Sequence, residues 1–172
     1  MSTTWDTLHH STEKGTDDWR TPRAFFDAVA AHYPLVIDAA ASPANAMLPR
    51  YWTAEDDALK QDWDAATAGG TQGAVWCNPP YGRGMDKWLE KARRERARGV
   101  TTVVLLFART DTAWWHDHAM RADRVFFVRG RLSFERPDGT KGAPAPAPSA
   151  LLVYYGSKAG LTAAPVFSTW EV

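Results

Sequence analysis

The sequence has one cysteine, no long apolar run and no net charge, and each absence excludes a class of protein. Cys77 alone cannot form a disulfide framework or a cysteine-based zinc site, and we interpret it as a small buried hydrophobe. No run of about eighteen apolar residues is present, so no membrane-spanning helix is expected. The N-terminus lacks the basic and apolar blocks of a signal peptide. We therefore expect a soluble cytoplasmic protein without a membrane partner.

The histidines and the charges exclude two further classes. The five histidines, His9, His10, His32, His116 and His118, lack metalloprotease-type spacing with a carboxylate, so no metal site is expected. A net charge of zero argues against a protein that coats nucleic acid. The charge is nevertheless split, because residues 1–78 carry 11 acids and 5 bases whereas residues 79–172 carry 9 acids and 15 bases. Many of these bases lie in the segment 87–98, which is typical of either a solvated helix face or a phosphate-binding surface.

Strand and helix patterns alternate over most of the chain, which at 172 residues is long enough for one domain. Residues 1–18 are polar and without periodicity, so we interpret them as a flexible arm. The pair Thr21 and Pro22 predicts a helix N-cap and first turn, with the helix running to about His32. The remaining predictions are strands at 35–38, 74–77, 101–107 and 125–128 and helices at 86–98 and 112–122. Alternation of this kind favours right-handed crossovers and a largely parallel sheet.

The C-terminal third has a different pattern. Residues 132–134 alternate into the turn residues 137–139, which predicts a β-hairpin or flap over residues 130–148. The repeated Ala-Pro of residues 143–148 predicts an extended segment, followed by a strand at 149–155. Residues 166–168 are expected to add an antiparallel edge strand.

The most informative motif is Asn78-Pro79-Pro80-Tyr81, directly after the apolar strand 74–77. Ligands of open α/β sheets bind outside the carboxyl ends of the strands, where this motif would lie. Two consecutive prolines make a stiff turn that offers carbonyl acceptors without backbone donors, and the Asn78 side chain adds another acceptor.

Acceptors of this kind suit a reaction at a planar amine. The lone pair of such an amine is delocalised, and acceptors aimed at its two N–H groups favour a pyramidal nitrogen in the transition state. Tyr81 can stack on the planar group and orient it towards an electrophile such as a sulfonium methyl group. The alternative is a proline-rich turn with a packed tyrosine.

The chain resembles the phage-type (Dam-like) DNA N6-adenine methyltransferases over about residues 17 to 156. The resemblance rests on Trp19-Arg20-Thr21-Pro22, Asp38-Ala39-Ala40-Ala41, Asn45, Tyr51, Asp57, Asp62-Trp63, the Asn-Pro-Pro-Tyr turn, Ala108-Arg109-Thr110-Asp111, Trp114, Gly130-Arg131, Phe134, Pro146 and Ser149. It implies a single α/β domain over residues 19–172, with the mostly parallel sheet of the S-adenosylmethionine-dependent (Rossmann-like) methyltransferases and a C-terminal flap. It also implies methyl transfer to the N6 amine of a flipped-out adenine in DNA, in the host cytoplasm if the gene is phage-borne.

The resemblance assigns roles by position. Asn78, Pro79, Pro80 and Tyr81 would be catalytic. S-adenosylmethionine would be bound by Trp19, Thr21, Pro22, Asp38, Ala39, Ala40, Asp57, Asp62 and Asn78, with either Asp57 or Asp62 on the adenosyl group. DNA would be contacted by Arg83, Arg109, Asp111, Arg131, Arg136 and Lys141. One departure is that alanines replace the glycine-rich loop of larger methyltransferases.

Two rival functions remain. Glutamine methyltransferases that act on release factors also carry an Asn-Pro-Pro-Tyr turn, but they have a long N-terminal helical domain that we do not find here. A catalytically silent nucleic-acid-binding module would use Tyr81 and the tryptophans only for stacking on single strands, and the zero net charge argues against it.

Overall fold

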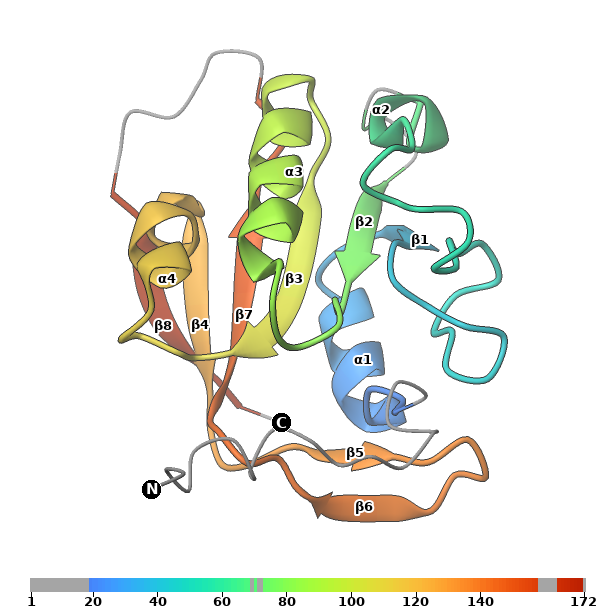
Figure 1. The fold of residues 1–172 in the computed structure, drawn as a ribbon. Coiled ribbons are helices and arrows are strands. Elements are labelled where there is room, and N and C mark those ends of the chain that lie inside the picture. The colour runs from blue at the N-terminus through green and yellow to red at the C-terminus, as the bar shows by residue number, and fades with distance from the viewer. Residues whose placement is uncertain (1–18, 69, 71–72, 158–163, 172) are drawn as a thin grey trace, which may run out of the picture.

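A six-stranded sheet forms the centre of the molecule (Figure 1). The computed structural model describes residues 19–68, 70, 73–157 and 164–171, so the expected arm at 1–18 lies outside the described residues. The strands of the sheet are β1 (Leu35–Asp38), β2 (Ala74–Cys77), β3 (Thr102–Phe107), β4 (Arg124–Val128), β7 (Ser149–Tyr154) and β8 (Val166–Trp170). The helices are α1 (Arg23–Ala30), α2 (Trp63–Ala66), α3 (Met85–Ala97), α4 (Ala113–Asp117) and a short 3-10 helix (Ala119–Arg121).

The sheet is mostly parallel, which confirms the prediction from strand and helix alternation. Its order is β1-β2-β3-β7-β4-β8, and only β7 runs antiparallel to its neighbours. The prediction for residues 166–168 was wrong in direction, because β8 pairs parallel with β4, from Arg124 opposite Val166 to Val128 opposite Trp170. Val153 near the end of β7 and Val166 at the start of β8 both lie opposite Arg124, so β8 begins beside the start of β4 and runs the same way.

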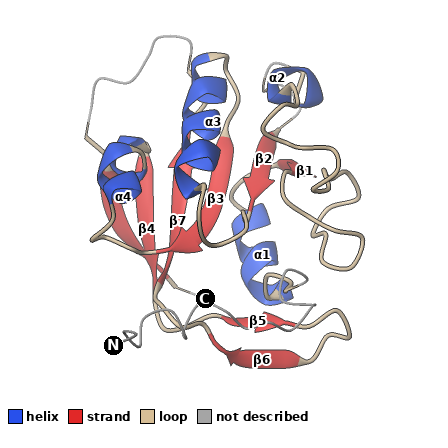
Figure 2. Ribbon diagram, in the orientation of Figure 1, coloured by secondary structure: helices blue, strands red, loops and turns tan. Residues whose placement is uncertain are grey.

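Helices cover both faces of the sheet, so its central strands are buried on each side (Figure 2). In β3, Val104 and Leu106 belong to the core that includes residues of α3 and α4. The alternate residues Val103 and Leu105 belong to the core formed with α1. Because side chains alternate across a strand, the nearly continuous apolar run of β3 supplies both cores.

Two helix termini differ from the sequence prediction. Pro22, not Thr21, is the residue at the N-cap of α1, and no side chain caps this helix. The predicted helix 112–122 is broken into α4 and the 3-10 helix, and the Thr112 hydroxyl donates to the Arg109 carbonyl at 2.7 Å instead of capping α4. Local residue preferences predict the presence of a helix better than its ends, since tertiary contacts compete for the capping groups.

A two-stranded antiparallel hairpin, β5 (Ser133–Glu135) and β6 (Lys141–Pro144), occupies the predicted flap position. Figure 1 shows it beneath the ends of β2 and β3. The chain leaves the sheet at the carboxyl end of β4, forms the hairpin and re-enters as the antiparallel β7. This route requires the hairpin to lie at the edge of the sheet where the parallel strands end.

Most of the basic side chains on α3 are engaged within the chain. Lys91 binds Glu95, Arg94 binds Glu90, and Arg96 makes two bonds of 2.9 Å with Asp123. Because intramolecular partners hold these cations, α3 is less suited to bind phosphates than its charge count indicates. Within the described ranges, no helix is long and apolar enough to cross a membrane.

Candidate active site

A cavity of about 1030 Å³ lies at the edge of the sheet where the parallel strands end. Its walls come from four segments that are far apart in the sequence. One wall is the predicted turn itself, because Asn78, Pro79, Pro80 and Tyr81 all line the cavity. The others come from the segments before α1, after β1 and in the hairpin, represented by Trp19, Thr21, Asp38, Ala39, Ala40, Asp57 and Arg136.

The carboxamide of Asn78 is held in a defined orientation. Its Nδ2 donates to Thr21 Oγ1 at 3.2 Å, and Thr21 is only 2% exposed. Its Oδ1 accepts a hydrogen bond from the Tyr81 hydroxyl at 2.8 Å. The acceptor oxygen of Asn78 therefore faces the cavity side occupied by Tyr81. Thr21, expected as a helix cap, instead positions Asn78 of the Asn-Pro-Pro-Tyr turn.

An aromatic cluster surrounds Tyr81. Its ring is stacked on Phe107, the last residue of β3, with centroids 4.0 Å apart and an interplanar angle of 13°. Phe134 of the hairpin makes an edge contact at 6.2 Å. The sequence predicts that Tyr81 stacks on a planar substrate group, but it does not indicate Phe107 or Phe134 as neighbours of this ring. The end of a buried strand beside the motif was the available signal for Phe107.

Asp38 ends β1 and is 2% exposed. Its carboxylate accepts from the backbone N–H of Met47 at 3.1 Å and of Ala40 at 3.3 Å. Burial raises the pKa of Asp38 from 3.8 to about 6, although the two backbone hydrogen bonds oppose this rise. The carboxylate thus shapes the loop of small residues that lines the cavity. It also offers a negative charge to a cationic ligand.

The raised pKa predicts an unusual dependence of stability on pH. Between pH 3.8 and about 6 the folded state binds more protons at Asp38 than the unfolded chain does, so this group lowers stability as pH rises. A shift of two units corresponds to roughly 3 kcal/mol. We expect the melting temperature of Asp38→Asn, relative to that of the wild type at the same pH, to increase as pH rises from 4 to 7. Thermal unfolding of both proteins at several pH values measures the two melting temperatures. A difference between them that does not change with pH would contradict this prediction.

The two candidate aspartates for the adenosyl group lie in different places. Asp57 lines the cavity and has a left-handed backbone conformation, with φ of 50°. Its carboxylate contacts Lys60 at 2.7 Å. Asp62 does not line the cavity; it caps α2 through the Ala65 N–H at 3.1 Å and pairs with Arg98 at 2.9 Å. A strained conformation of a residue other than glycine is often found at functional sites.

The hairpin supplies a further part of the cavity wall. Phe134, Arg136 and residues 143–146 line it. The Arg136 guanidinium lies over the Trp19 ring at 5.3 Å, and Trp19 packs so closely on Gly142 that a side chain there would collide with the ring. Glu55, which the sequence analysis did not identify, also lines the cavity.

The other expected site residues lie outside the cavity wall. The Arg131 guanidinium donates to the Ala145 carbonyl at 2.9 Å and so braces the hairpin segment. The remaining residues in this group, Pro22, Arg83, Arg109, Asp111 and Lys141, do not line the cavity. Among the described residues, no group of three or more His, Cys, Asp or Glu is arranged to hold a metal ion.

The fold and the cavity together define an α/β protein with a ligand site at the carboxyl ends of its parallel strands, a common position for catalysis. Residues 9–160 match the family described as DNA N-6-adenine-methyltransferase (Dam), so the chain belongs to that family.

Two relatives extend the comparison. A DNA N-6-adenine-methyltransferase of Escherichia phage T1 is 32% identical over 130 residues, which are 74% of this chain and 50% of the phage protein. YfdM of Escherichia coli (strain K12), named as a candidate methyltransferase, is 38% identical over 73 residues, which are 42% of this chain and 79% of YfdM. The match with the phage protein therefore spans half of that protein's length.

Proposed function

We propose that this protein transfers a methyl group from S-adenosylmethionine to the N6 amine of adenine in DNA, on a sheet of the Rossmann-like methyltransferase type. The observation that carries the proposal is the Asn78 carboxamide. Its Oδ1 already accepts a hydrogen bond of 2.8 Å beside a large cavity, and its other end is fixed on buried Thr21. A preorganised acceptor of this kind suits an amino group that becomes positive as it reacts.

The residues present fit S-adenosylmethionine. The cavity is at the upper end of the range of about 300 to 1,000 Å³ for small-molecule sites, which leaves room for a second planar group. Asp38 lies beside the cavity with backbone-bound oxygens, and Ala39 and Ala40 allow close approach to the backbone. Asp57 and Glu55 provide further carboxylates in the cavity wall, suited to hydroxyl groups. Because it lines the cavity, Asp57 is favoured over Asp62 for the adenosyl group.

The chain's own groups would orient and activate the amine. S-adenosylmethionine supplies an electrophilic methyl group whose sulfur leaves with the bonding electron pair as a neutral thioether. Asn78 Oδ1 would accept one N–H of the amine, with a carbonyl of the proline turn as the second acceptor. Both bonds strengthen as charge develops on nitrogen, and the surplus proton then passes to water. Asn78 acts here by orientation, since a carboxamide is not a general base.

A base in duplex DNA must leave the stack to reach this site, at a cost of a few kcal/mol. Tyr81 and Phe107 would hold the extruded base. Their rings are 4.0 Å apart, about one stacking distance, so a base between them requires Tyr81 to swing away. Gly82 and Gly84, both with positive φ and open space around them, allow this movement directly after the motif.

The hairpin is the proposed DNA-contacting flap. Arg136 directly follows β5, is exposed to solvent and lines the cavity. We expect Arg136→Gln to weaken DNA binding by roughly tenfold and to reduce the slope of log K against log salt by about one. The affinity for S-adenosylmethionine should change little. Arg124→Gln, at the opposite edge of the sheet, is the matched control, and fluorescence anisotropy at several salt concentrations measures both.

An equal loss of DNA affinity in the Arg136 and Arg124 variants would remove the flap from the proposal. Arg131 is less suited to this test. Its bond to the Ala145 carbonyl means that its substitution would also loosen the hairpin.

The proposed function is tested by incubating the protein with tritium-labelled S-adenosylmethionine and, separately, DNA, RNA or protein. Digestion of the DNA to nucleosides should place the label in N6-methyl-2′-deoxyadenosine. Label in protein alone would favour the glutamine methyltransferase. DNA binding without any methyl transfer would favour the silent module.

A further inference from the structure

One wall of the cavity is a loop without regular secondary structure. It spans residues 53–61, here called the 53–61 loop, and its members Thr53, Ala54, Glu55, Asp57 and Ala58 line the cavity. Asp57 has a left-handed backbone conformation, with φ of 50°, which aspartate adopts more readily than most residues other than glycine. Contacts from outside the cavity hold the residues on either side of it.

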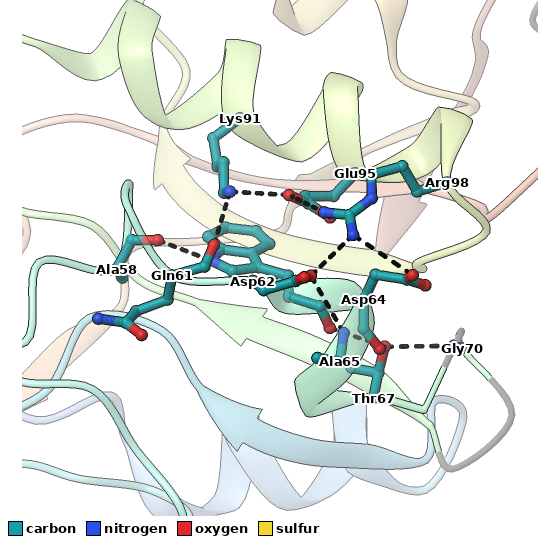
Figure 3. A network of polar contacts seen from close by, with 11 residues as sticks. Ala58, Gln61, Asp62, Asp64, Ala65, Thr67, Gly70, Lys91, Glu95 and Arg98 are labelled. Carbon is teal, nitrogen blue, oxygen red and sulfur yellow. Dashed lines mark hydrogen bonds and ion pairs between the residues drawn. The ribbon is translucent and has the colours of Figure 1, made fainter.

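The first of these contacts is made by Trp63 at the start of α2. Its indole Nε1 donates to the Ala58 carbonyl at 2.8 Å (Figure 3). Trp63 is fully buried and its ring is stacked on Trp52, with centroids 6.1 Å apart. The residue after Asp57 is therefore tied to the core.

The second contact is made by Lys91 on α3. Its Nζ donates to the Gln61 carbonyl at 2.8 Å and to Glu95 Oε1 at 2.7 Å. It also lies 5.6 Å from the Trp63 ring centroid. Figure 3 shows Lys91 between the helix and the end of the loop. Gln61 in turn donates from its side chain to the Asp56 carbonyl. Lys91 is therefore connected through Gln61 to the residue before Asp57.

Glu95 holds Lys91 in this position. The Glu95 side chain is 3% exposed and also accepts two hydrogen bonds from Arg98, at 3.1 and 3.0 Å. A buried ion pair is a poor source of stability, because well-packed apolar residues of similar size often serve as well or better. The ion pair instead orients the Lys91 ammonium group. One N–H of this group is bound by Glu95, and another donates to the Gln61 carbonyl in the loop.

We propose that the Lys91–Glu95 pair is a positioning device for S-adenosylmethionine, which acts through Gln61 and Trp63 to hold Asp57 and Ala58 in the cavity wall. This inference rests on the proposed function of the cavity. Neither charged residue lines the cavity, so neither is a catalytic residue. Loosening the wall should weaken cofactor binding without altering the Asn78 turn on which the chemical step depends.

The test compares four variants with the wild type. Lys91→Met removes both hydrogen bonds and keeps an unbranched side chain of similar length. Trp63→Phe removes the indole donor to Ala58, together with part of the buried ring that stacks on Trp52 and contacts Lys91. Lys91→Arg retains a cation with donors for both partners. Arg94→Met is the control, because Arg94 pairs with Glu90 on the exposed side of the same helix.

Binding of S-adenosylmethionine is measured by calorimetry well below each variant's melting temperature, and kcat is measured at saturating cofactor. We expect Lys91→Met and Trp63→Phe each to raise Kd by roughly tenfold, equivalent to about 1.4 kcal/mol, with kcat within about twofold of wild type. The Kd of Lys91→Arg for S-adenosylmethionine should lie within about threefold of the wild-type value, and the Kd of Arg94→Met should equal the wild-type value.

Kd values unchanged in the Lys91→Met and Trp63→Phe variants, even with lowered melting temperatures, would overturn the inference and leave a purely structural pair. A loss in kcat larger than the rise in Kd would also overturn it. If Lys91→Met does not fold, Trp63→Phe decides alone. Failure of the wild type itself to bind S-adenosylmethionine would instead refute the proposed function.

Discussion

Replacement of Asn78 by alanine is expected to lower kcat by about two to three orders of magnitude, the usual effect of losing one preorganised polar group at a reacting centre. Asn78 Oδ1 is the side-chain acceptor of the turn, and its orientation is fixed through Nδ2 on Thr21. The fold should survive, because Asn78 lies after β2 and not within the buried strand. Single-turnover methyl transfer and circular dichroism measure the two effects separately.

Asn78→Asp is the matched comparison for this prediction. A carboxylate keeps an acceptor at the same place and can accept from the Thr21 hydroxyl, so it should retain far more activity than alanine. Equal losses in the two variants would mean that the acceptor is not what matters at this position. Near-normal turnover of Asn78→Ala would remove the turn from the mechanism altogether.

Removal of the Tyr81 ring is expected to have the second largest effect. Tyr81→Ala should lower kcat/KM by roughly 10- to 100-fold, since base–aromatic stacking contributes about 1 to 3 kcal/mol per base. Tyr81→Phe keeps the ring but removes the hydroxyl that now occupies Asn78 Oδ1 at 2.8 Å. In the proposed reaction the substrate amine donates to the same oxygen, so Tyr81→Phe should retain activity and bind DNA at least as tightly as wild type.

Steady-state kinetics with DNA as the varied substrate measure both tyrosine variants. DNA carrying the fluorescent base 2-aminopurine at the methylated position reports base extrusion directly, since its emission rises when it leaves the stack. A Tyr81→Phe variant as impaired as Tyr81→Ala would show that the hydroxyl takes part in the reaction. Normal kinetics of Tyr81→Ala would exclude stacking by this residue.

Local residue patterns were sufficient to predict the strands and helices that alternate along the chain, the hairpin and the rigid geometry of the Asn-Pro-Pro-Tyr turn. The strand patterns of β2 and β3 are continuous apolar runs, and the turn residues 137–139 mark the hairpin without ambiguity. The motif after β2 is equally local, because prolines set backbone geometry by their own covalent structure. The positions of the strands, the hairpin turn and the stiffness of the motif depend on neighbouring residues only, so the sequence alone determined them.

The tertiary structure decided which side chains share the cavity. It brought Thr21 to Asn78, separated Asp57 from Asp62, and placed Phe107 and Phe134 around Tyr81. It also set the direction of β8 and committed most of the α3 cations to internal partners. Each of these outcomes depends on contacts between residues distant along the chain. A hydroxyl or carboxylate takes whichever partner the fold brings near, and periodicity and spacing carry no information about that partner.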